Sequence, residues 1–246
     1  MLRAILSDVH ANLEALEACL AHARSRGATG HAFLGDLVGY GADAAAVVER
    51  VMQLASDGAV TIKGNHDAAI EKRESYFNHD AHASLDWAAK TLSGEQKRFL
   101  AGLPLVASAS PAYFVHASAA DPAKWTYVDS PGAAARCAEV ADAAYTFCGH
   151  VHDQRLYFST TKGHMSAFTP VPGVSVPVRG TRRWLGVVGS VGQPRDRNPA
   201  AAYALFDDAS CAITFFRIPY DHHAAARKIR EAGLPGTLAY RVEAGI

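Results

Sequence analysis

The chain has 246 residues, 24 Lys and Arg balanced by 24 Asp and Glu, and a hydrophobic content of 49%. This length fits one α/β domain over residues 1–246, and the lack of a basic excess disfavours binding along an extended nucleic acid. No apolar run reaches the roughly 18 residues needed to cross a membrane, and Asp8 interrupts the N-terminal apolar stretch. We therefore expect a cytoplasmic protein without a membrane partner.

The first half of the chain alternates strand-like and helix-like segments. Residues 2–7 form a short apolar run, and apolar residues then recur at helical spacing over 13–26. The same order repeats, with strands predicted at 31–34, 59–62, 112–115 and 145–148 and helices at 44–54, capped by Asp43, and 133–143. Such alternation predicts an α/β sheet layered with helices.

Two regions depart from this alternation. Residues 68–104 have a helical pattern, which predicts a small helical lid insertion in which Ser93 caps the second helix. From about 153 to 218 the chain changes to short strand-like runs separated by Gly, Pro and Asp, which is typical of antiparallel β structure. A last helix is predicted after Asp221, and no pattern assigns a structure to residues 233–246.

Polar side chains that bind metal ions follow five of the predicted strands. They are Asp8 and His10, Asp36, Asn65 and His66, His116, and His150 and His152. Because ligands of open α/β sheets bind at the carboxyl ends of the strands, we expect these side chains to converge. Without His66, the set has two carboxylates, four imidazoles and one amide, which suit Mn, Fe, Zn, Co or Ni. Seven ligands are too many for one ion, so the set predicts two ions that share a carboxylate.

Five short motifs contain these residues: DVH at 8–10, GDLVGYG at 35–41, GNHD at 64–67, VH at 115–116 and GHVH at 149–152. In this order they resemble the motif set of the calcineurin-like metallophosphoesterases. The segment GSVGQPRD at 189–196 resembles the bacterial branch related to diadenosine tetraphosphatases and small phosphodiesterases. The resemblance implies an α/β fold in which two mixed β-sheets pack face to face with helices on the outside, an αββα sandwich.

The resemblance also implies a role for each ligand. The first divalent ion, with manganese favoured, would be held by Asp8, His10, Asp36 and His152, and the second by Asp36, Asn65, His116 and His150. A hydroxide that bridges the ions would attack phosphorus, and His66 would protonate the leaving oxygen while Asp67 orients His66. The implied activity is hydrolysis of a phosphoester or phosphoanhydride bond in a small nucleotide-like substrate, by a phosphodiesterase or a dinucleoside polyphosphate hydrolase.

The chain departs from the protein Ser/Thr phosphatase branch at one position. That branch has a phosphate-binding arginine where this chain has Gly39-Tyr40-Gly41, which disfavours activity on phosphoproteins. A phosphomonoesterase or a protein phosphatase is the alternative activity. A non-catalytic scaffold on the same fold is disfavoured, because the ligand set is complete and His66 is intact.

Three candidate substrate contacts complete the predicted site. Arg195 follows a Gly-rich turn and replaces the missing arginine, although a solvated loop arginine fits equally well. Asn12 precedes a helical stripe, so a helix N-cap is as good an interpretation as a substrate contact. Asn65 is predicted to contact substrate as well as metal. The three tryptophans are expected in the core.

Overall fold

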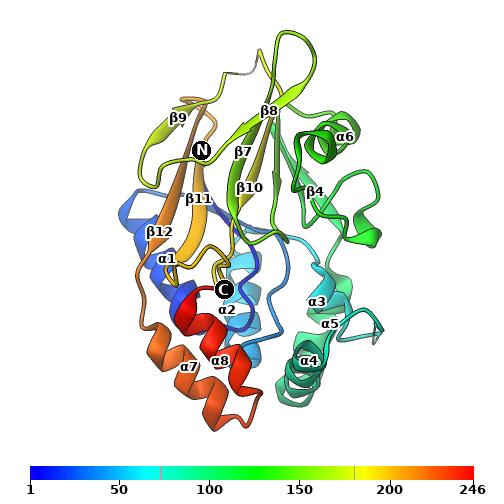
Figure 1. Ribbon diagram of the computed structural model, residues 1–246, viewed down its shortest axis with the longest axis vertical. Coiled ribbons are helices and arrows are strands. Elements are labelled where there is room, and N and C mark those ends of the chain that lie inside the picture. The colour runs from blue at the N-terminus through cyan, green and yellow to red at the C-terminus, as the bar shows by residue number, and fades with distance from the viewer. Residues whose placement is uncertain (73, 180) are drawn as a thin grey trace.

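A computed structural model describes residues 1–72, 74–179 and 181–246. Over these residues the chain forms two six-stranded mixed sheets packed face to face, with helices on the outside, which confirms the predicted fold class (Figure 1). The first sheet has the order β3 (Val60–Thr61), β2 (Gly30–Phe33), β1 (Leu2–Leu6), β11 (Ala201–Asp207), β12 (Ala212–Ile218) and β9 (Ser175–Pro177). The second has the order β4 (Val106–Ala109), β5 (Ala112–Val115), β6 (Tyr145–Cys148), β10 (Trp184–Val188), β7 (Gln154–Ser159) and β8 (Met165–Phe168).

The strands that precede the predicted ligands are parallel to one another within each sheet. In the first sheet β1 pairs with β2 and β2 with β3, and in the second β5 pairs with β6. Asp8, Asp36 and Asn65 therefore leave one sheet at the same edge, and His116 and His150 leave the other. The second half is largely antiparallel, as predicted, but β10 also pairs in parallel with β6.

The core between the sheets is built from aromatic side chains of both. Phe114 and Phe147 come from the second sheet, and Phe206 and Phe215 from the first, and all four are fully buried. The rings of Phe147 and Phe206 lie 5.2 Å apart across the interface. Truncating such a side chain to alanine costs about 3–5 kcal/mol of stability, so this interface fixes the distance between the two sets of strand ends.

The helices surround the sandwich, some on the outer faces of the sheets and others beside the ends of the strands (Figure 1). They are α1 (Leu13–Ser25), α2 (Ala44–Ser56), α3 (Asn65–Ala68), α4 (His79–Thr91), α5 (Gly94–Gly102), α6 (Pro131–Ala141), α7 (His222–Glu231) and α8 (Gly236–Ala244). The predicted insertion contains α4 and α5, whose Leu85 and Leu100 share one hydrophobic core with Leu16 and Val47. These two helices are therefore part of the main core. In the described part of the chain, no helix combines the length and apolar character needed to cross a membrane.

Several elements were not predicted. Strands β4 and β8 lie at sheet edges and are partly exposed, so their sequences lack a buried apolar run. Helix α8 lies in the segment without an assigned structure, and it packs with α7 as a hairpin seen at the lower left of Figure 1. Asp43 occupies the N-cap position of α2 but makes no capping hydrogen bond; its carboxylate accepts from Lys228 Nζ at 2.7 Å. Ser93 caps α5 as expected.

Candidate metal centre

The loops that carry the ligands are joined by backbone hydrogen bonds. The Asp8 N–H donates to the Gly35 carbonyl at 3.1 Å, and the His10 N–H donates to the Asp36 carbonyl at 2.9 Å. Left-handed backbone, with φ between 49° and 71°, occurs at Asp8, His10, Asp36, His150 and His152. Such a conformation costs of order 1–3 kcal/mol for a residue other than glycine, so the surrounding structure holds these side chains in place.

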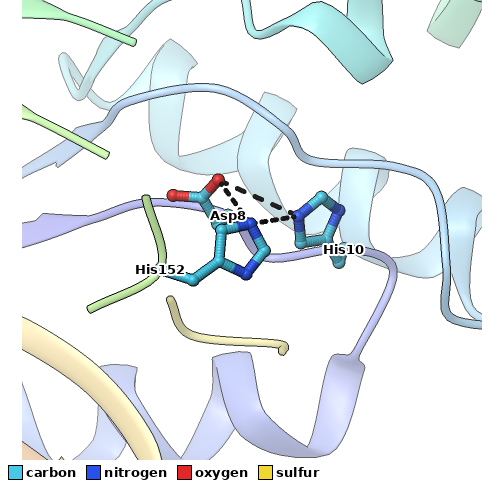
Figure 2. A group of neighbouring side chains, drawn as sticks. All are labelled: Asp8, His10 and His152. Atoms are coloured by element: carbon cyan, nitrogen blue, oxygen red, sulfur yellow. Dashed lines mark hydrogen bonds and ion pairs between the residues drawn. The ribbon is translucent and has the colours of Figure 1, made fainter. Parts of the chain in front are cut away.

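Asp8, His10 and His152 form the first ligand group (Figure 2). The Nε2 atoms of His10 and His152 lie 3.2 Å apart, and His152 Nε2 lies 3.2 Å from Asp8 Oδ1. The opposite nitrogen of each ring, Nδ1, donates to a backbone carbonyl, that of Val38 for His10 and that of Gln193 for His152. Since Nδ1 carries the proton, Nε2 presents a lone pair to the centre.

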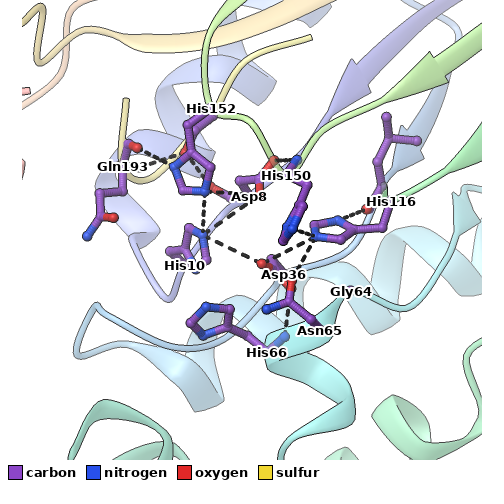
Figure 3. A network of polar contacts seen from close by, with 12 residues as sticks. Asp8, His10, Asp36, Gly64, Asn65, His66, His116, His150, His152 and Gln193 are labelled. Carbon is purple, nitrogen blue, oxygen red and sulfur yellow. Dashed lines mark hydrogen bonds and ion pairs between the residues drawn. The ribbon is translucent and has the colours of Figure 1, made fainter. Parts of the chain in front are cut away.

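The second group consists of Asp36, His116 and His150, with Asn65 beside them (Figure 3). His116 Nε2 lies 3.2 Å from His150 Nδ1 and 3.1 Å from Asn65 Oδ1. The Nδ1–H of His116 donates to the Leu34 carbonyl at 2.7 Å. Nitrogen and oxygen atoms with lone pairs thus converge here as they do in the first group.

The Asp36 carboxylate lies between the two groups. Its Oδ2 is 3.8 Å from His10 Nε2 and 3.4 Å from His116 Nε2. Its Oδ1 accepts a hydrogen bond from the His66 backbone N–H at 2.8 Å, which fixes the orientation of the carboxylate. A carboxylate in this position faces both groups at once, as a ligand shared by two ions would.

The electrostatics of the site fit cations. Burial lowers the pKa of His10, and burial together with His116 lowers that of His150 to about 3, so both imidazoles are neutral. Burial alone would lower the pKa of His116, but the Asp36 carboxylate raises it to about 9. Asp8 Oδ1 is buried and has no hydrogen-bond partner among the described residues. A divalent ion would satisfy that oxygen and replace the proton between Asp36 and His116.

His66 and Asp67 follow Asn65 in the short helix α3. The His66 ring lies between Tyr40 and Phe77, with centroid distances of 4.6 and 4.7 Å, and lines the pocket above the ligands. One of its nitrogens also lies within 4.8 Å of ligand atoms of His10 and Asp36. A position beside the ligand groups agrees with the predicted proton donor, whose role stays a prediction.

The predicted role of Asp67 needs correction. Its carboxylate accepts hydrogen bonds from the backbone N–H groups of Asp36, Leu37 and Gly64 at 2.8–2.9 Å, and it does not contact the His66 ring through a hydrogen bond in the described structure. Asp67 therefore holds the Asp36 loop against α3 and does not orient the imidazole. Its sequence position beside His66 gave no sign of this, because two of the three amides, those of Asp36 and Leu37, come from a loop about 30 residues earlier in the sequence.

The predicted substrate contacts have different environments. The Asn12 amide donates to the Gly192 carbonyl and to the Tyr220 hydroxyl, and its oxygen accepts from the Ala15 N–H. Asn12 is thus a helix N-cap, one of the two interpretations that the sequence allowed, and both of its amide donors are occupied; the substrate contact stays a prediction. Arg195 lines the pocket and is half-buried, and its Nε has no hydrogen-bond partner in the described ranges.

A cavity of about 300 Å³ opens over the ligand groups. Besides metal-site residues and Arg195, aromatic side chains dominate its lining: Tyr40, Tyr76, Phe77, Trp125 and Tyr127. The sequence reasoning missed these residues and wrongly placed Trp125 in the core. The signal that was available is that the segments directly after GNHD and after the VH motif at 115–116 each contain a cluster of aromatic residues.

Comparison with known proteins agrees with this geometry. Residues 1–210 match the calcineurin-like phosphoesterase superfamily domain. An uncharacterized protein of Methanocaldococcus jannaschii is 32% identical over 248 residues, which cover 98% of this chain and 97% of that protein. The crystal structure of a metallophosphoesterase from Sphaerobacter thermophilus is similar, with a TM-score of 0.88 and 34% identity over 100% of this chain and 99% of that chain.

A hypothetical protein from Pyrococcus horikoshii shares the fold, with a TM-score of 0.79 and 18% identity over 100% of this chain and 98% of the other. The match over residues 1–210, together with the paired ligand groups at the strand ends, identifies the class of protein. The chain belongs to the calcineurin-like phosphoesterase superfamily and is a metallophosphoesterase that uses divalent metal ions.

Proposed function

We propose that this protein uses two divalent transition-metal ions to hydrolyse a phosphoester or phosphoanhydride bond in a small nucleotide-like substrate. The observation that carries the proposal is the position of Asp36 Oδ2, which faces ligand nitrogens of both groups. When bound, two ions at such a site supply an activated water nucleophile and neutralise charge on the phosphoryl group. The mixed carboxylate, amide and imidazole donors suit Mn, Fe, Zn, Co or Ni, and manganese is the ion that the family resemblance favours.

In this proposal the residues of the site have separate roles in metal binding, proton donation and phosphate binding. Asp8, His10, Asp36 and His152 would hold one ion, and Asp36, Asn65, His116 and His150 the other. We assign proton donation to the leaving oxygen to His66, and the position of its ring in the lining of the pocket, beside the ligands, supports this role. Arg195 binds a phosphate oxygen, since its guanidinium faces the same cavity.

The cavity supports a small substrate. Its volume of about 300 Å³ is at the lower end of the roughly 300–1,000 Å³ typical of small-molecule sites. Apart from the metal-site residues its lining is rich in aromatic side chains, with Arg195 and Lys124 as the cationic side chains among the described residues. This lining favours a phosphorylated molecule with an apolar planar part over a phosphorylated protein segment. The same preference follows from Gly39-Tyr40-Gly41, which stands where protein Ser/Thr phosphatases have a phosphate-binding arginine.

An activity screen tests the proposal. Metal-depleted protein is reconstituted with Mn²⁺, Co²⁺, Zn²⁺ or Fe²⁺ and assayed on bis-p-nitrophenyl phosphate, p-nitrophenyl phosphate, nucleotides and diadenosine tetraphosphate. We expect hydrolysis only after reconstitution, with nucleotide-like esters or anhydrides preferred. Full activity of the metal-depleted protein would contradict the two-ion mechanism, and activity restricted to p-nitrophenyl phosphate and simple monoesters would contradict the substrate class.

A further inference from the structure

Two large aromatic side chains stand exposed at the mouth of the cavity. Tyr76 precedes α4 and is 56% exposed, and Tyr127 lies between a 3₁₀ turn (Pro122–Lys124) and α6 and is 48% exposed. Both line the same cavity, although 51 positions separate them in the sequence. Catalysis at the ligand groups gives no role to either ring. Exposed apolar surface gathered at one place marks a binding site more often than chance exposure does.

On one side of the cavity, aromatic rings run from the metal site to the surface. The Phe77 ring lies 4.7 Å from that of His66, and the Tyr76 ring lies 4.5 Å from that of Phe77. The first ring of this row belongs to the predicted proton donor, which is buried. The last ring, Tyr76, is 56% exposed, while its side chain is hydrogen-bonded to that of Asn65.

On the other side, Tyr127 stacks on a metal-site imidazole. Its ring lies 4.3 Å from the His150 ring at an interplanar angle of 19°. Within the described chain His150 is its one ring partner, and Tyr127 is 48% exposed, so part of its surface is open to a ligand. Trp125, two residues earlier, also lines the cavity, with its ring 5.9 Å from that of His116.

We propose that these two aromatic rows form the binding site for a planar aromatic group of the substrate, a nucleobase, attached to the phosphoryl group that reaches the ligand groups. The inference rests on the proposed function only for the part of the substrate that carries the phosphoryl group; binding of the base does not depend on it. Stacking on aromatic side chains is tolerant of base identity, because every base has a π-face.

The polar groups near the rows predict weak discrimination between bases. The side-chain oxygen of Asn78 accepts from the Ala81 N–H and caps α4, and Lys124 pairs with Asp121 at 2.9 Å. The Asn78 oxygen and the Lys124 ammonium thus have local partners. We expect affinity to follow the area of the stacked ring, with purines bound more tightly than pyrimidines.

The experiment measures binding of adenosine, which has no phosphate and cannot be hydrolysed as an ester. Full-length protein is titrated with adenosine and with ribose by calorimetry and by saturation-transfer NMR. The variants are Tyr76→Ala, Tyr127→Ala and Tyr127→Phe. Tyr240→Ala is the matched control, because Tyr240 is 60% exposed on α8 and does not line the cavity.

We expect adenosine to bind, ribose not to bind, and each alanine variant at the cavity to lose roughly 5- to 150-fold in affinity. Tyr127→Phe and Tyr240→Ala should retain the wild-type affinity. Absence of adenosine binding, or equal affinity in all variants with unchanged melting temperatures, overturns the inference. Hydrolysis is assayed separately: protein that binds adenosine but hydrolyses no phosphoester refutes the proposed function and leaves the aromatic site standing.

Discussion

His10 and His152, which are 142 positions apart in the sequence, bring their Nε2 atoms to 3.2 Å of each other while the Nδ1 atom of each ring contacts a backbone carbonyl. Because each Nδ1 carries the ring proton, two lone pairs face each other across that gap. Neutral imidazoles in this arrangement repel, and a cation between them turns the repulsion into coordination. Asp8 Oδ1 lies 3.2 Å from His152 Nε2 and supplies the negative charge.

Metal binding should therefore stabilise the fold. An ion present at 100 times its Kd stabilises the native state by about 2.7 kcal/mol for one site. For a chain of this size we expect an increase of roughly 5–10 °C in Tm on addition of Mn²⁺ to chelator-treated protein. Differential scanning fluorimetry measures the shift, and Mg²⁺ at the same ionic strength controls for screening. A Tm that does not respond to any transition-metal ion would contradict the assignment.

The position of Asp36 between the two groups predicts the metal content of variants. Asp36→Asn removes negative charge next to both sites, so it should reduce bound metal from two ions towards none. Asp8→Asn affects the first group alone and should leave about one ion per chain. Elemental analysis measures both, with Asp57→Asn as the control because Asp57 is exposed at the end of α2. Two ions retained in Asp36→Asn would show that the carboxylate is not shared.

Gly39 controls the position of His66. A Cβ at Gly39 would lie 2.2 Å from His66 Nδ1, whereas a Cβ at Gly58 would meet nothing within 4 Å, and both glycines have positive φ. Gly39→Ala should displace the imidazole and lower kcat by at least 10-fold, towards the roughly 10²–10⁴-fold of a lost general acid. Gly58→Ala has similar backbone strain without the clash and should keep kcat. Steady-state kinetics on a nucleoside ester compares the two variants. Equal kcat values would show that Gly39 does not control the position of His66.

The parts of the site that sequence predicted correctly are those fixed by local chemistry. Asp8 and Asp36 lie two and three residues after strands whose parallel pairing brings the strand ends together, so their convergence was foreseeable. The N-cap role of Asn12 was among the interpretations that the sequence allowed, but the role of Asp67 was not predicted, because two of its three partners, the Asp36 and Leu37 amides, come from a loop about 30 residues earlier in the sequence.

The aromatic lining of the cavity and helix α8 were also not predicted, because both depend on contacts between separate segments of the chain. Tyr127 is defined by its stacking on His150, and α8 by its packing against α7; both contacts depend on how elements dock. Periodicity within a segment carries no information about such contacts. The sequence therefore predicted the ligands at the strand ends but not the aromatic residues that line the cavity around them.

Arg195 provides a test of substrate binding that is independent of the metal ions. A hydrogen bond from a charged group contributes about 1.5–3 kcal/mol, so Arg195→Ala should lower kcat/KM by roughly one to two orders of magnitude with unchanged metal content. Arg197→Ala is a suitable control, because Arg197 is a nearby exposed arginine that does not line the cavity. Kinetics that barely change in Arg195→Ala would make it a solvated loop residue.

The last prediction concerns the proton that the leaving group requires. His66→Gln keeps a polar side chain of similar length beside Asn65, so both ions should remain bound. A general acid contributes roughly 10²- to 10⁴-fold, and its contribution shrinks when the leaving group departs without a proton. We therefore expect a large loss of kcat on a nucleoside or alkyl ester and a distinctly smaller loss on p-nitrophenyl esters, whose phenolate is a good leaving group.

The comparison between the two ester types is informative only when the chemical step limits the rate. Single-turnover measurements establish that condition, and elemental analysis of the same His66→Gln sample establishes its metal content. Equal losses on both esters under these conditions would remove His66 from proton donation. Since its ring lies beside His10 and Asp36 at the floor of the cavity, such a result would instead assign His66 to stabilising charge on the phosphoryl oxygens.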